Sequence, residues 1–200
     1  PLLIHKRKCP KFFLMSFCRI LLKSSRFRRS LITHLKSDYY HEIENSLPLR
    51  NGFWAHILEN DSYNSFSEIF ILKEYESFLP KGNISKIIDI GANYGFFSLW
   101  IQSNTSKDTI SSLLIEPSFR CKRSLDKLVS QPRLKNQFKY LQRVISNPKT
   151  KEVDFYERPF MASSSFRVND KEISSSVKTL QEKEIYSKLK PPFDLIKCDI

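Results

Sequence analysis

The stretch IIDIGANYGFFSLW, from Ile87 to Trp100, decides the fold. The apolar run from Lys86 to Ile90 that begins it is bounded by glycines, which is typical of a strand buried on both faces of a parallel sheet. Two of the four glycines in the chain, Gly91 and Gly95, follow at once. The apolar residues after them predict a short helix over residues 95–102. The stretch therefore predicts a buried strand, a tight turn and a helix.

The alternation of strands and helices continues along the rest of the chain. Further parallel strands are predicted over residues 111–115, 138–145 and 193–200, and helices over residues 118–129 and 180–189. Residues 153–156 and 163–167 indicate two short antiparallel strands beside the sheet. This order predicts an α/β fold with a doubly wound, mostly parallel sheet. Because such a sheet usually continues past its fourth strand, we expect a fragment that is truncated there.

The residues before the first parallel strand are less regular. Arg50, Asn51 and Gly52 predict a turn, and residues 65–79 predict a helix if the aliphatic stem of Lys73 counts as apolar. The breaker residues from Pro80 to Asn83 would end that helix. The sequence thus predicts three parts, which are a basic helical arm (1–36), an N-terminal helical region (37–82) and the core (83–200).

The net charge of +12 is unevenly distributed. Residues 1–36 carry ten basic and no acidic side chains, whereas the remainder carries 23 basic and 21 acidic ones. Phe13, Phe17 and Ile20 fall on one face of a helix in this arm. Such a helix can make peripheral contact with an anionic membrane, or it can pack on the domain or on a partner. Nucleic acid is disfavoured because no RNA-binding module follows the arm.

The cysteines and the apolar runs restrict the class of protein further. The four cysteines form no C-x-x-C pair and have no histidine at ligand spacing, so no zinc or other metal site and no disulfide framework is indicated. The run from Phe12 to Leu22 is shorter than the roughly 20 residues that a spanning helix needs. Basic residues follow it where a leader peptide would have small ones. We therefore expect a cytoplasmic protein, with membrane association through the arm left open.

The turn after the first parallel strand points to a cofactor that contains adenosine. Gly91 allows a tight turn, Gly95 allows close approach of a ligand or of the helix to the strand, and Asn93 tolerates positive φ. Glu116 ends the next strand about 20 residues later, the offset of a carboxylate that binds ribose hydroxyls.

Asp89 would repel a pyrophosphate but could pair with the cationic end of S-adenosylmethionine. The missing G-x-G-x-x-G pattern also disfavours NAD. A strand, turn and helix without a ligand is the structural alternative.

The sequence resembles the FkbM-type S-adenosylmethionine-dependent methyltransferase family. The resemblance covers residues 66–200 and rests on six segments in the same order: FSEIFILKEY (66–75), IIDIGANYGFFS (87–98), IEPS (115–118), VISN (144–147), VKTL (177–180) and DLIKCDI (194–200). It implies a class I, Rossmann-like methyltransferase fold and methylation of a hydroxyl on a sugar, glycan or secondary metabolite. The Glu-Gly that follows the last of these segments in the family is missing from this chain, so the substrate pocket cannot be assigned.

The resemblance also implies the residues that contact the cofactor. It assigns Asp89, Gly91, Asn93 and Gly95 to the methionine and ribose, and Glu116 to the ribose. Residues 144–146 would lie near the adenine. The predicted S-adenosylmethionine-binding set is therefore Asp89, Gly91, Ala92, Asn93, Gly95, Phe96, Glu116, Pro117, Val144 and Ile145.

Asp199 and Lys197 are the candidate catalytic residues. A hydroxyl is a poor nucleophile at neutral pH, so its attack on a methyl group requires a base or a metal. The resemblance puts Asp199 beside the transferred methyl, where it could act as the base or orient the acceptor. Lys197 lies two residues earlier on the same face of the strand and could tune it. A purely structural ion pair is the alternative.

Two other functions stay open from the sequence. One is a membrane- or partner-docking protein in which a degenerate methyltransferase body presents the basic arm. The other is an RNA methyltransferase, which the net charge alone suggests. The segment Lys190 to Phe193 resembles the N-P-P-Y motif of amino-directed methyltransferases, but it precedes the last strand and is better explained as a helix stop.

Overall fold

The computed structural model describes most of the chain after residue 44. The described residues are 45–59, 61–79, 82–105, 110–147, 149–157 and 173–199. They all belong to one structural unit, His41–Ile200. The predicted basic arm, the predicted strand over residues 163–167 and Ile200 lie outside the described residues.

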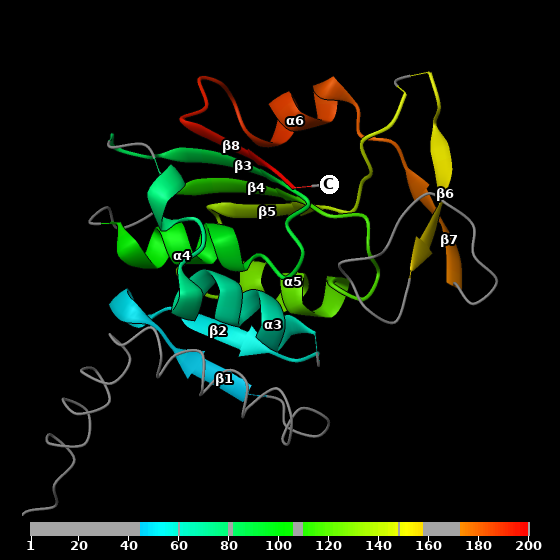
Figure 1. The fold of residues 1–200 in the computed structure, drawn as a ribbon. Helices are drawn as coiled ribbons and strands as arrows, with labels where there is room; N and C mark the ends of the chain where they lie inside the picture. Colours follow the sequence, from blue (N-terminus) through cyan, green and yellow to red (C-terminus); the bar gives the residue numbers. More distant parts are fainter. Residues whose placement is uncertain are drawn as a thin grey trace, which may run out of the picture. The chain divides into compact units, whose positions relative to one another are not determined.

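A four-stranded parallel sheet forms the centre of the fold (Figure 1). It consists of β3 (Lys86–Ile90), β4 (Ser111–Ile115), β5 (Phe138–Leu141) and β8 (Leu195–Cys198), in the order β5-β4-β3-β8. The predicted α/β class with a parallel sheet is confirmed, and the strand order is compatible with a Rossmann-like fold. After β3 the chain adds strands on one side, and it returns to the other side of β3 with β8.

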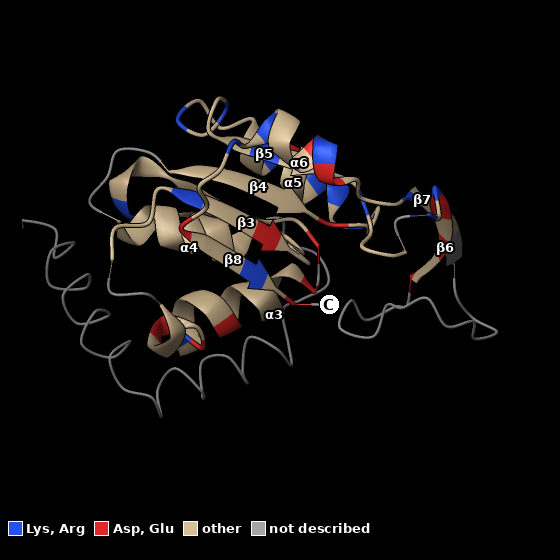
Figure 2. Ribbon diagram, turned by 90° about the horizontal axis from the view of Figure 1, so that it is seen from above, with Lys and Arg blue, Asp and Glu red and all other residues tan. Residues whose placement is uncertain are grey.

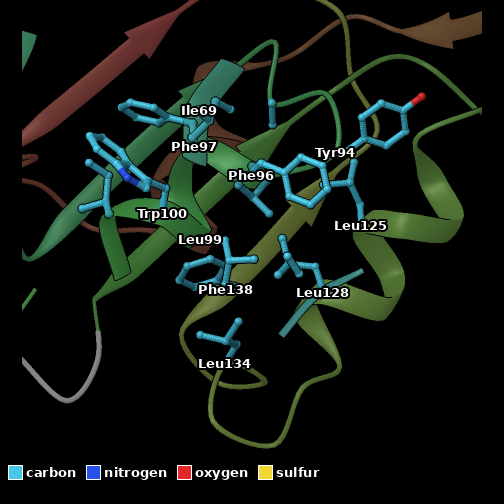
Figure 3. Close-up of a cluster of buried hydrophobic side chains, with 14 of the residues drawn as sticks. Ile69, Tyr94, Phe96, Phe97, Leu99, Trp100, Leu125, Leu128, Leu134 and Phe138 are labelled. Atoms are coloured by element: carbon cyan, nitrogen blue, oxygen red, sulfur yellow. The ribbon is translucent and has the colours of Figure 1, made fainter. Parts of the chain in front are cut away.

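Helices cover both faces of this sheet (Figure 1). Helices α4 (Phe96–Asn104) and α5 (Lys122–Val129) pack on one face, and α6 (Glu182–Lys188) packs on the other. Alternate residues of the strands supply the two cores. The larger core, on the side of α4 and α5, is shown in Figure 3 and includes the labelled residues Ile69, Tyr94, Phe96, Phe97, Leu99, Trp100, Leu125, Leu128, Leu134 and Phe138.

The region expected to be helical over residues 37–82 contains a β-hairpin as well. Strand β1 (Asn45–Pro48) pairs antiparallel with β2 (Trp54–Ile57) across the 3₁₀ turn η1 (Arg50–Gly52), which confirms the predicted turn. Gln131 at the end of α5 receives the Trp54 N–H at 3.1 Å and donates to the Trp54 carbonyl at 2.8 Å. The Gln131 amide thus satisfies both backbone groups of Trp54, as a paired strand would, and links the hairpin to the end of α5.

The helix predicted over residues 65–79 is wrong at both ends. Helix α3 (Ser62–Phe66) continues as a π-helical segment, η2 (Ser67–Leu72), and a separate 3₁₀ turn, η3 (Glu76–Phe78), follows. The break falls at Lys73, whose φ of 58° is left-handed. Lys73 pairs with Glu76 near the surface and does not bury its stem in the core, so the apolar repeat ends at Leu72.

The segment after β5 also differs from expectation. The strand predicted over residues 138–145 ends at Leu141. Val144 does not continue it and instead forms an isolated bridge with Thr179. Strand β6 (Glu152–Glu157) pairs along its whole length with β7 (Ile173–Lys178), a strand that the sequence did not predict. Val144, Phe155 and Val177 form a small third core beneath this pair.

The remaining predicted elements are confirmed with shifted ends. The helix predicted from Ser118 begins at Lys122, and the predicted last strand is shorter at both ends. Pro191 and Pro192 lie between α6 and β8, at the amino end of the strand. Among the helices within the described ranges, none has the length and apolar character needed to cross a bilayer.

Candidate functional site

The carboxyl ends of β3, β4 and β8 meet where the glycine turn leaves β3. The N–H groups of Gly91 and Ala92 both donate to the Ile115 carbonyl at the end of β4, at 2.9 and 3.1 Å. Gly91, Asn93 and Gly95 have φ values of 68°, 52° and 76°. Three left-handed residues within five reverse the chain sharply, so the turn lies directly against the end of the neighbouring strand.

Gly95 is required by packing. A Cβ atom at Gly95 would lie 2.4 Å from Leu128 Cδ2 and 3.1 Å from Leu125 Cδ2. Both leucines belong to α5, which therefore approaches the start of α4 as closely as the backbone allows. The sequence indicated close approach of a ligand or of the following helix to the strand, and the geometry adds a third reason for this glycine, the close packing of α5.

Asp89 is a buried carboxylate at the end of β3. Its Oδ2 accepts a hydrogen bond of 2.9 Å from the Ser98 hydroxyl, which in turn accepts one of 2.8 Å from Ser112. Its Oδ1 has no hydrogen-bond partner among the described residues and lies 3.4 Å from Lys197 Nζ. Burial raises the pKa of Asp89, while Lys197 and Ser98 act in the opposite direction. The carboxylate is thus held by Ser98 at one oxygen and paired with Lys197 at the other.

Lys197 links the two central strands at this edge. It is the direct register partner of Asp89, and Figure 2 shows this acidic position of β3 beside a basic position of β8. Its Nζ donates to the Gly91 carbonyl at 2.8 Å and lies 3.5 Å from Asp199 Oδ2. The side chain is 11% exposed and lies over the ring of Phe97. Lys197 therefore ties the glycine turn to two carboxylates.

Asp199 is the exposed member of this group. Its N–H donates to the Ile90 carbonyl at 3.1 Å, which extends the pairing of β8 with β3 by one residue. Its side chain is 64% exposed, and Oδ2 accepts a hydrogen bond of 3.0 Å from the Tyr75 hydroxyl. The predicted catalytic pair, Asp199 and Lys197, is brought together, and it is joined by Asp89 and Tyr75.

Glu116 lies at the end of β4 with its carboxylate almost wholly buried. One oxygen accepts the N–H of Asn93 at 2.8 Å and the other accepts the N–H of Ser118 at 3.0 Å. Burial raises the pKa of Glu116, and these two N–H groups counteract the rise. Each carboxylate oxygen has more than one lone pair, so Glu116 can hold the turn and still accept a ligand hydroxyl.

Other predicted cofactor residues use their side chains for packing. The Asn93 amide donates to Ser65 at 2.9 Å and accepts from the Cys121 thiol at 3.3 Å. Ala92 and Phe96 are buried, and Phe96 lies in the aromatic part of the core shown in Figure 3. Any ligand contact from Ala92 or Phe96 would therefore come from the backbone.

The remaining predicted cofactor residues, Pro117, Val144 and Ile145, lie beyond the ends of β4 and β5. The Pro117 carbonyl accepts a hydrogen bond of 3.3 Å from Gln142. Val144 is buried in the third core, whereas Ile145 is 38% exposed. Of the two, only Ile145 presents its side chain to solvent.

The structure adds polar residues that the sequence did not single out. Glu157, at the end of β6, accepts hydrogen bonds from the Ser118 hydroxyl at 2.5 Å and the Phe119 N–H at 2.7 Å. Ser98 could have been found from its place inside the motif, one helical turn after the glycines. Tyr75 and Glu157 carry no such signal, because their partners are distant in sequence.

No metal centre is found among the residues that the structure describes, since no three His, Cys, Asp or Glu side chains are grouped to hold an ion. Comparison with protein-family models, with curated proteins and with solved structures finds no match.

Proposed function

We propose that this protein is an S-adenosylmethionine-dependent methyltransferase that methylates a hydroxyl group on a sugar, glycan or secondary metabolite. The observation that carries the proposal is the position of the glycine turn with Asp89 and Glu116. They gather at the carboxyl end of β3, with Glu116 at the end of β4 on one side and β8 on the other, where the chain changes direction across the sheet. In open α/β sheets, ligands bind outside the carboxyl ends of the strands at such a point.

The charges at this edge favour a cationic cofactor over a dinucleotide. Asp89 and Glu116 are both buried carboxylates, and a pyrophosphate beside them would add like charge at low dielectric. A sulfonium or ammonium group would instead supply a positive charge near Asp89. Its buried Oδ1 is paired with Lys197 Nζ at 3.4 Å, and such a group would add to that pairing. Glu116 fits the ribose hydroxyls, which are neutral donors.

When bound, S-adenosylmethionine supplies a methyl group that is attached to a positively charged sulfur. The acceptor oxygen bonds to the methyl carbon, and the sulfur leaves with the electrons of the broken bond. The chain must hold the acceptor hydroxyl and take its proton. Asp199 is the exposed carboxylate of the site, and we assign it the role of base. Lys197 holds the glycine turn and keeps positive charge between Asp89 and Asp199.

Isothermal titration of the protein with S-adenosylhomocysteine tests the proposal. We expect micromolar binding, and we expect Glu116→Gln to weaken it about 10- to 100-fold because a charge-assisted hydrogen bond is worth roughly 1.5–3 kcal/mol. Glu152→Gln, an exposed change on β6, is the matched control and should leave the affinity unchanged. Absence of binding at high micromolar ligand would refute the proposal. Release of S-adenosylhomocysteine with a panel of hydroxylated acceptors would then identify the substrate class.

A further inference from the structure

We propose that Tyr75 is a positioning residue for Asp199, which it orients toward the methyl acceptor. The inference rests on the proposed function and deepens it. Within the described part of the chain, both side-chain contacts of Asp199 are made by Oδ2, one with the Tyr75 hydroxyl and one with Lys197. Oδ1 is therefore the oxygen that can receive a hydroxyl proton.

Tyr75 is anchored at its ring as well as at its hydroxyl. The ring packs edge-on against Phe97, with centroids 5.0 Å apart, and Phe97 is buried in the first turn of α4. Burial and the bond to Asp199 both raise the pKa of Tyr75. The phenol therefore stays protonated at neutral pH and donates to the carboxylate throughout the working range.

The break in the helix after Leu72 brings Tyr75 to this place. Lys73 takes the left-handed conformation, the N–H of Glu74 bonds to the Glu68 carbonyl, and the chain turns before Tyr75. The hydroxyl then reaches β8, 124 residues further along the sequence. The departure from a regular helix is thus what joins this segment to the site.

An exposed aspartate needs such a restraint. Asp199 is 64% exposed, and an aspartate that is free to rotate at a strand end samples several rotamers. Lys197 is itself fixed by Asp89 and the Gly91 carbonyl. Tyr75 and Lys197 together hold Oδ2 from two sides, which orients the other oxygen before the acceptor arrives.

Asp199 lies beside Lys197, which bonds to the glycine turn proposed to hold the cofactor, so its oriented carboxylate also stabilises the positive charge on the transferred methyl group. The test therefore compares binding of S-adenosylmethionine and S-adenosylhomocysteine, which differ by the methyl group and its positive charge. In Tyr75→Phe the ring contact with Phe97 is kept and only the hydroxyl is lost. We expect the dissociation constant for S-adenosylmethionine to rise about three- to tenfold, as for loss of one hydrogen bond, and that for S-adenosylhomocysteine to stay unchanged. Asp199→Asn should likewise raise the dissociation constant for S-adenosylmethionine relative to that for S-adenosylhomocysteine. Adding Tyr75→Phe to Asp199→Asn should have no further effect.

Tyr186→Phe is the matched control, because Tyr186 also donates to a carboxylate, that of Glu182, but on the surface of α6. It should leave both dissociation constants unchanged. If the unaltered protein binds both ligands and Tyr75→Phe leaves their ratio unchanged, or if its effect persists in Asp199→Asn, the role of Tyr75 is refuted and the proposed function stands. If the unaltered protein binds neither ligand, the proposed function itself fails.

Discussion

The two ends of β3 and β8 use charged residues in opposite ways. At the amino end, Asp194 accepts the N–H groups of Ser85 and Lys86 at 2.7 and 2.9 Å, and Lys86 Nζ donates to the Lys190 carbonyl at 2.9 Å. At the carboxyl end, Lys197 lies between Asp89 and Asp199.

This difference suggests that the amino-end charges stabilise the fold, whereas the carboxyl-end charges belong to the candidate site. The amino-end charges are exposed and are bonded to backbone groups, so they fix the register of the strands at little cost. The carboxyl-end charges face one another, and Asp89 is wholly buried. Buried charges are costly to the fold and gather at functional sites, which supports the proposal that the carboxyl end binds the cofactor.

The largest effect should follow from removing the central charge of the carboxyl end. Lys197→Met leaves Asp89 buried without its positive partner, which we expect to lower the free energy of unfolding by about 3–5 kcal/mol at pH 7. Urea unfolding measures it. Lys122→Met, which breaks an exposed ion pair with Asp126 on α5, is the control and should cost less than about 1 kcal/mol. Equal losses in the two variants would show that the buried charges do not matter to the fold.

A smaller effect is expected at the amino end. Asp194→Ala removes the acceptor for two backbone N–H groups, but water can replace it at this exposed position. We expect a loss of about 1–2 kcal/mol in urea unfolding and no change in the affinity for S-adenosylhomocysteine. A tenfold loss of affinity in this variant would contradict the division of roles between the two ends.

A further expected effect is a dependence of stability on pH. The pKa of Asp89 is raised above 3.8 in the folded protein, so the folded state holds this proton more tightly than the unfolded state does. The stabilising contribution is complete below pH 3.8 and is lost as the pH rises through the raised pKa. The stability of the unaltered protein relative to Asp89→Asn should therefore fall as the pH rises above about 4, by at most about 1.4 kcal/mol per pH unit. Parallel stability curves would contradict this.

The sequence predicts the parallel sheet well because burial leaves a local signal. Strands β3 and β4 have the predicted ends, since continuous apolar runs lie between residues that cannot continue them. The break at Lys73 could not be predicted, because an aliphatic stem next to apolar residues looks the same whether it is buried or paired with Glu76. The partner of β6 was also missed, because the serines of β7 lack an alternating pattern.

The site was predictable only in part for a related reason. Asp89, Glu116, Lys197 and Asp199 adjoin strands whose order follows from the pattern, so their meeting could be expected. The bond from Tyr75 to Asp199 spans 124 residues and depends on a turn that no local signal marks. Asn93 and Phe96 are predicted to contact the cofactor, and the fold uses their side chains for internal hydrogen bonds and packing, which leaves the backbone for that contact.

Hydrogen exchange with and without S-adenosylhomocysteine tests most directly whether the carboxyl end of the sheet is the binding end. The account predicts slower exchange in residues 89–96 and 116–121 when the ligand is present, with residues 84–87 and 190–195 unchanged. Protection confined to the amino end, or no protection at the carboxyl end under saturating ligand, would contradict it.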